Sequence, residues 1–216
     1  MEIILINIVL SGDNAVVIAL ACRNLPPDLQ KKAIFWGSGG AIALRAILTV
    51  VAVWLLKIPF LQIVGGLLLF WIAIKLLAGD NEEEELKGGS NIKEAIKTII
   101  IADLAMSLDN VVAVAGAAGG NLLLIALGLG ISIPLIIWGS QLLMALMNRF
   151  PIIITAGAGL LGYTAGEMIL GDKAAGHFVE SIIPSSHYSV PIFGVLIVLI
   201  VGKLLSRKHP TELKEV

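Results

Sequence analysis

The chain is short of charge. Asp, Glu, Lys and Arg make up only 14% of its 216 residues, whereas ordinary globular chains carry roughly 25%. Hydrophobic residues make up 57%, and the mean hydropathy is +0.95. A soluble domain of this length has no core large enough to bury so much apolar surface. We therefore expect an integral membrane protein with the lipid bilayer as its surroundings and no nucleic acid among its partners.

Cysteine and the common catalytic motifs are also scarce. The single cysteine, Cys22, excludes a disulfide framework and a thiolate metal cluster within one chain. There is no His-Glu-x-x-His motif and no Walker-type phosphate-binding loop in the sequence. We therefore expect neither an enzyme nor a prosthetic group, and any transport would draw its energy from a gradient.

Long apolar runs are abundant instead. Runs of roughly 17–25 residues are long enough to cross a bilayer as a helix, and they predict an all-α polytopic membrane protein. The first run lacks the positive flank and cleavage site of a signal peptide, so we expect it to be retained. The seven expected spans lie near 2–21, 33–56, 59–78, 97–118, 121–147, 151–170 and 189–206.

The basic residues predict the direction of these spans. With the N-terminus outside, twelve Lys and Arg residues fall on the inner side and two, Lys57 and Lys173, on the outer side. Cytoplasmic loops are rich in Lys and Arg. The sequence therefore predicts an N-out, C-in topology in a plasma membrane.

A short polar motif occurs twice within apolar runs. Ser11-Gly12-Asp13-Asn14 recurs as Ser107-Leu108-Asp109-Asn110, at an offset of 96 residues. Segments 59–80 and 151–172 match in the same way at an offset of 92. Each unit has three spans, an odd number, so the second unit would be inverted relative to the first, as in many transporters.

This duplication predicts the organisation of the chain. We expect two inverted three-helix repeats, joined by an acidic cytoplasmic linker and followed by an extracytoplasmic loop and a seventh helix with a basic cytoplasmic tail. The two repeats would cover residues 1–78 and 97–170, with the linker at 79–96 between them. The loop would cover residues 171–188, and the seventh helix with its tail residues 189–216.

The polar residues of the motif predict a cation site. A charged Asp at the centre of a membrane helix costs about 2.5–3.5 kcal/mol, so such residues face a cavity, a partner or an ion. Carboxylate, amide and hydroxyl oxygens suit Mg²⁺, Ca²⁺ or Mn²⁺. The alternative is that the two Asp-Asn pairs only hydrogen-bond helices together. The candidate ligands are Asp13, Asn14, Asp109 and Asn110, with Ser11 and Ser107 as secondary candidates.

Helical spacing adds two residues on the same faces. Asn7 precedes Ser11 by four residues, and Asp103 precedes Ser107 by four, which places each pair on one helix face. Because the units are inverted, Asp103 would lie on the cytoplasmic side of Asp109, and we expect cations to reach the site from the cytoplasm. The alternative for Asp103 is contact with interfacial water.

Arg45 is the one basic residue expected deep within a span. It lies about twelve residues, or roughly 18 Å, from either end of its span, too far for snorkelling. We expect it to face the same cavity and to pair with one of the aspartates. Three aspartates and one arginine would leave two negative charges for one divalent cation or two protons. Glu167 lies near a span end and is a secondary candidate, with snorkelling as the alternative.

The two motifs, with their flanking residues Ala15-Val16-Val17 and Val111-Val112-Ala113, resemble those of the TerC family of integral membrane proteins, in its short form. The resemblance covers the first six spans and most of the seventh. It implies acidic site residues at Asp13, Asp103 and Asp109, manganese export across a bacterial plasma membrane, and membership of the lysine-exporter-like transporters. Family members often have an acid where this chain has Asn7.

These observations predict a secondary transporter that exports a divalent cation, with Mn²⁺ as the expected substrate. One alternative is export of a small organic cation or amino acid. Another is a membrane scaffold that transports nothing and acts in tellurite or envelope stress or delivers metal. A homo-oligomer or a partner in the secretion machinery is compatible with each.

Overall fold

The structure is a computed structural model that describes residues 12–55, 58, 60–79, 90–118, 122–172, 176 and 186–208. Asn7 and Ser11 lie outside these residues. Asp109 and Asn110 belong to a described helix, but their side chains lie outside the description. The structural account of the candidate site therefore rests on its other members.

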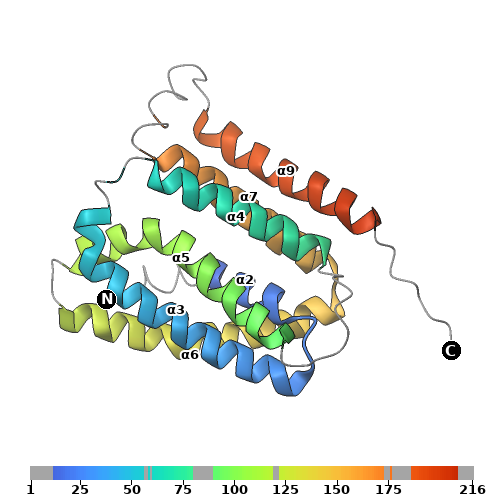
Figure 1. Cartoon of the computed structure of the whole chain (residues 1–216), viewed down its shortest axis with the longest axis horizontal. Helices are drawn as coiled ribbons and strands as arrows, with labels where there is room; N and C mark the ends of the chain where they lie inside the picture. The colour runs from blue at the N-terminus through green and yellow to red at the C-terminus, as the bar shows by residue number, and fades with distance from the viewer. Residues whose placement is uncertain are drawn as a thin grey trace.

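The described residues form α-helices, which confirms the all-α expectation (Figure 1). The seven helices within the described residues are α2 (Gly12–Cys22), α3 (Pro27–Leu55), α4 (Leu61–Ala78), α5 (Ser90–Ala118), α6 (Leu122–Arg149), α7 (Ile152–Gly171) and α9 (Ser186–Lys208). In this described part of the chain, three helices are long and apolar enough to cross a membrane: α4, α7 and the Ser186–Ser206 part of α9.

Two helices begin six or more residues earlier than the apolar runs predict. α3 begins at Pro27 instead of residue 33, and α5 begins at Ser90 instead of residue 97. Hydropathy detects only the part of a helix that lies in hydrocarbon, whereas a helix can continue into the polar zone on either side. Proline is favoured in the first turn, and Asp28 next to Pro27 complements the helix dipole there.

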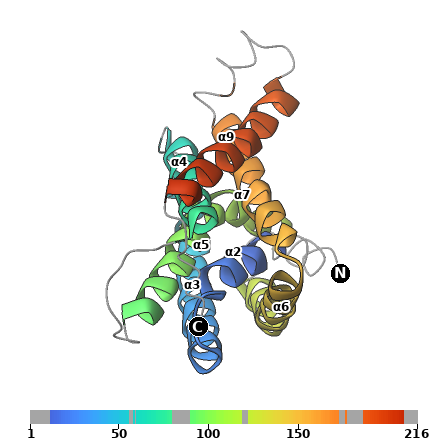
Figure 2. The ribbon, with the colours of Figure 1, turned by 90° about the vertical axis from the view of Figure 1, so that its right-hand side faces the viewer.

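The helices form two groups with α2 between them (Figures 1 and 2). α4, α7 and α9 pack against one another on one side. On the other side α3 runs along α5, and α6 packs against α2. The short helix α2 also contacts α3, α5 and α7, so its residues lie in the middle of the molecule.

Glycines bring the helices of the first group close together. A Cβ atom on Gly162 of α7 would lie 2.8 Å from the carbonyl oxygen of Gly194 in α9. A Cβ on Gly66 of α4 would lie 2.8 Å from the carbonyl oxygen of Ala165. Membrane helices associate through such small residues because lipid supplies no hydrophobic drive between them.

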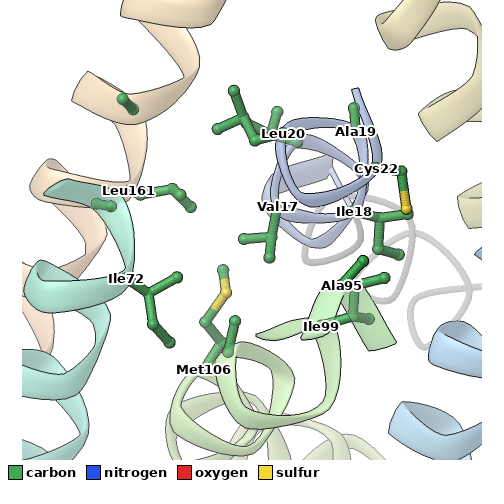
Figure 3. Close-up of a cluster of buried hydrophobic side chains, with 14 of the residues drawn as sticks. Val17, Ile18, Ala19, Leu20, Cys22, Ile72, Ala95, Ile99, Met106 and Leu161 are labelled. Carbon is green, nitrogen blue, oxygen red and sulfur yellow. The ribbon is translucent and has the colours of Figure 1, made fainter. Parts of the chain in front are cut away.

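An apolar cluster holds α2 in place (Figure 3). Val17 and Leu20 of α2 lie among Ile72, Met106 and Leu161, which come from α4, α5 and α7. All five side chains are 2% exposed or less, so Met106 is a packing residue. Because Met106 precedes Ser107 on α5, this cluster also sets the height at which α2 meets the polar residues of α5.

Candidate cation site

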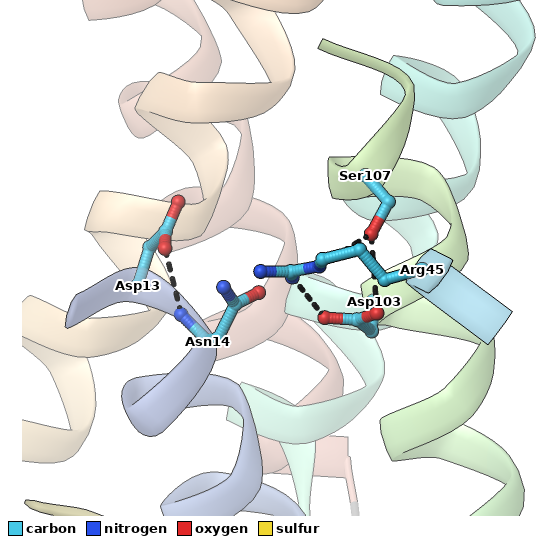
Figure 4. A network of polar contacts seen from close by, with 5 residues as sticks. All are labelled: Asp13, Asn14, Arg45, Asp103 and Ser107. Atoms are coloured by element: carbon cyan, nitrogen blue, oxygen red, sulfur yellow. Dashed lines mark hydrogen bonds and ion pairs between the residues drawn. The ribbon is translucent and has the colours of Figure 1, made fainter. Parts of the chain in front are cut away.

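A buried ion pair joins α3 to α5. Arg45 and Asp103 are 4% and 7% exposed, and the Arg45 Nη2 atom donates to Asp103 Oδ1 (Figure 4). The expectation that Arg45 pairs with an aspartate is confirmed, and the partner is Asp103. The alternative that Asp103 reaches interfacial water finds no support, because its side chain is buried against another helix.

Ser107 closes this pair into a triad. The Arg45 Nε atom donates to Ser107 Oγ at 3.1 Å, and the Ser107 hydroxyl donates to Asp103 Oδ2 at 3.1 Å. Ser107 and Asp103 are four residues apart on α5 and therefore share a face. Such additional hydrogen bonds are what a buried ion pair needs to offset the cost of desolvation.

Asn14 of α2 faces this triad. It is 4% exposed, and Figure 4 shows its side chain pointing toward the Arg45 guanidinium, which lies between Asn14 and Asp103. Asp13 behaves differently. It is half-buried, and its Oδ1 atom accepts the backbone N–H of Asn14 at 2.8 Å. Its carboxylate lies on the far side of Asn14 from the guanidinium.

A small cavity of about 20 Å³ adjoins these residues. Three of its polar lining residues are Asn14, Arg45 and Asp103, which the sequence predicts for the site. Its other lining residues come from α2, α3, α5 and α6: Val17, Ile18, Ser38, Ala41, Ile42, Ile99 and Ile136.

Ser38 is a polar residue of this cavity that the sequence analysis does not single out. It lies seven residues before Arg45 on the same helix, which is a spacing that places both on one face. That spacing was the available signal, but a lone serine in an apolar helix is too common to point to a site.

Glu167 does not join the cluster. It lies at an exposed position of α7 and does not line the cavity. Among the described residues no group of three or more His, Cys, Asp and Glu side chains lies together. The described part of the site thus offers carboxylate, amide and hydroxyl oxygens, which is the donor set of a hard cation.

The chain is similar in sequence to known membrane proteins. The profile of the integral membrane protein TerC family matches residues 1–210. The uncharacterized membrane protein YjbE of Bacillus subtilis (strain 168) is 46% identical over 185 residues, which cover 83% of this chain and 85% of that protein. The uncharacterized membrane protein YceF of the same organism is 25% identical over 217 residues, with coverages of 96% and 82%.

No solved structure matches the chain. The family match nevertheless extends over all the described helices. This chain is therefore an integral, multi-pass membrane protein that belongs to the TerC family.

Proposed function

We propose that this protein is a secondary transporter that exports a divalent metal cation, with Mn²⁺ as the substrate, across a bacterial plasma membrane. The observation that carries the proposal is the buried triad of Arg45, Asp103 and Ser107. Ionisable residues are expensive within a membrane and mark ion pathways there. A small cavity beside the triad is lined by Asn14 as well as by Arg45 and Asp103.

The arginine explains how the site tolerates the absence of a cation. A guanidinium stays protonated in proteins, so Arg45 balances the charge of Asp103 between transport cycles. A divalent cation that binds Asp103 competes with the guanidinium for the same oxygens. With Asp13 beside Asn14, the described residues around the cavity include two acidic side chains and one arginine, an excess of one acid that favours a cation.

The pairing of the helices supports the inverted repeat. If α2, α3 and α4 correspond to α5, α6 and α7, the contact of α3 with α5 corresponds to the contact of α6 with α2, and both contacts occur. α4 and α7, which correspond to each other, also pack together. Two such units rocking about a central site would expose it to one side at a time.

The donor chemistry alone does not choose among Mn²⁺, Mg²⁺ and Ca²⁺. We choose Mn²⁺ because manganese export is what the resemblance to the TerC family implies. A competition assay with the three ions measures this choice directly.

The test is Mn²⁺ flux into liposomes that contain the purified protein, read by the quenching of an enclosed dye. We expect the Asp103→Asn variant to lose flux and Mn²⁺ binding together. The matched control is Asp28→Asn, which removes an exposed carboxylate from the first turn of α3, and it should transport like the wild type. Unchanged flux in Asp103→Asn contradicts the site, and wild-type binding without flux favours the scaffold alternative.

A further inference from the structure

Ser38 of α3 carries a buried hydroxyl group. The residue is 1% exposed, and within the described part of the chain its Oγ atom makes no hydrogen bond. Buried polar groups are nearly always hydrogen-bonded, because leaving one unsatisfied costs free energy. Ser38 lines the same cavity as Arg45 and Asp103, so a small molecule in that cavity would satisfy its hydroxyl.

The cavity has a polar end and a mostly apolar wall. Ser38 lies seven residues before Arg45, which corresponds to about 10 Å along α3 at 1.5 Å per residue. The wall between them includes Ile42 of α3 and Ile99 of α5. On the topology that the basic residues predict, the Ser38 end is the one nearer the cytoplasm.

The packing of α3 on α5 fixes this part of the wall. A Cβ atom on Gly37, the neighbour of Ser38, would lie 2.7 Å from the Cδ1 atom of Ile99. The two helices are therefore in close contact beside Ser38, and Ile99 has little room to withdraw toward α3. The wall beside Ser38 is therefore mostly apolar, and the Ser38 hydroxyl is a polar group that this wall offers.

We propose that Ser38 is the first polar station of the path from the cytoplasm to Asp103, where its Oγ atom accepts a hydrogen bond from a water molecule bound to the divalent cation. This inference rests on the proposed cation transport and adds the route by which the ion arrives. A neutral hydroxyl suits such a station because it binds a hydrated cation more weakly than a carboxylate does, and the ion can move on.

The single cysteine makes the path directly testable. A Cys22→Ala background removes the buried thiol, and Ser38→Cys then places one thiol in the cavity. In inside-out vesicles a charged, membrane-impermeant thiol reagent should label this variant, and MnCl₂ should slow the labelling where NaCl at equal ionic strength does not. The matched control is Gly39→Cys, because Gly39 is exposed on another face of the same helix turn and should stay unlabelled in lipid.

A kinetic measurement tests the hydroxyl itself. Ser38→Ala should raise the KM for Mn²⁺ flux by about tenfold, at the low end of the effect of losing an outer-shell partner of a metal. Ser38→Thr, which keeps the hydroxyl, should restore most of it. The inference is overturned if the Ser38→Cys variant is not labelled, if MnCl₂ leaves the labelling unchanged, or if Ser38→Ala transports with the wild-type KM.

The outcomes also separate this inference from the proposed function. Labelling that MnCl₂ slows, in a protein without Mn²⁺ flux, contradicts export and supports the Ser38 station. Wild-type flux together with a Ser38→Cys variant that resists the reagent supports export and overturns the station.

Discussion

Arg45 and Asp103 form a buried ion pair between two helices, although 58 residues separate them in the chain. Removing one partner of such a pair leaves an uncompensated buried charge, at a cost of about 3–5 kcal/mol. We expect Arg45→Met and Asp103→Asn each to lower the unfolding temperature in detergent strongly. The double variant should be destabilised by clearly less than the sum of the two.

A second ion pair, which lies outside the cavity, provides the control for this comparison of single and double variants. Lys75 and Glu94 form an ion pair at 2.6 Å between α4 and α5, with both side chains partly accessible. An exposed pair contributes no more than about 1 kcal/mol, so Lys75→Met and Glu94→Gln should change the unfolding temperature little. Additive effects of the Arg45 and Asp103 substitutions contradict a direct interaction.

Ser107 differs from Ser140, another buried serine, in its hydrogen-bond partners. Its hydroxyl links Arg45 to Asp103, whereas Ser140 donates to the carbonyl oxygen of Ile137 in its own helix at 3.0 Å. Ser107→Ala leaves a donor of the guanidinium without this acceptor, which costs about 1–3 kcal/mol. We expect it to weaken Mn²⁺ binding in calorimetry, while Ser140→Ala has little effect. Equal effects of the two contradict a specific role of Ser107.

Glycine-to-alanine substitutions should have opposite effects at two positions. At Gly162 the added Cβ would lie 2.8 Å from the Gly194 carbonyl oxygen, and such overpacking costs about 1–3 kcal/mol. At Gly39 no atom lies within 4 Å of the added Cβ, so alanine should stabilise the helix by about 0.5–1 kcal/mol. Thermal unfolding of both variants in the same detergent measures the difference, and a stable Gly162→Ala variant argues against the α7–α9 contact.

Asn14 should matter more than its charged neighbour Asp13 for contact with the triad. Its side chain points toward Arg45 and lines the cavity, so Asn14→Ala should reduce Mn²⁺ affinity by about tenfold, as expected for loss of one metal-site partner. Asn24, exposed in the turn after α2, is the matched control. If the Asn14→Ala variant binds Mn²⁺ with the wild-type affinity, Asn14 of α2 is not part of the site.

Part of the candidate site follows from the sequence alone. Arg45 lies too deep in its span to snorkel, so a pairing with an aspartate was predictable. The choice of Asp103 was not, because it depends on how far α3 and α5 are shifted along each other, which packing decides. Ser38 escaped prediction for the same reason: its significance lies in what the neighbouring helices place around it.

The repeated motif suggests that Asp and Asn have equal roles in the site. In the structure, Asp13 and Asn14 of the first motif are placed differently. Asp13 and Asn14 are adjacent in sequence, yet only the asparagine side chain points to the triad. Neighbouring residues on a helix point about 100° apart, so the two side chains leave α2 in different directions. Substitution of Asp109 and Asn110, one at a time, tests whether the members of the second motif differ in the same way.

The sequence by itself determined that this is an all-helical membrane protein of the TerC family, because long apolar runs and a paired polar motif are local properties of the chain. Tertiary structure alone decided which charges meet, which serine closes the ion pair and which one lines the cavity. The physical reason is that a chain segment in the membrane must form a helix, because its backbone groups have no water to bind there. Contacts between helices depend instead on where small residues lie and on how each helix is rotated and shifted relative to its neighbours, which the sequence of one span does not determine.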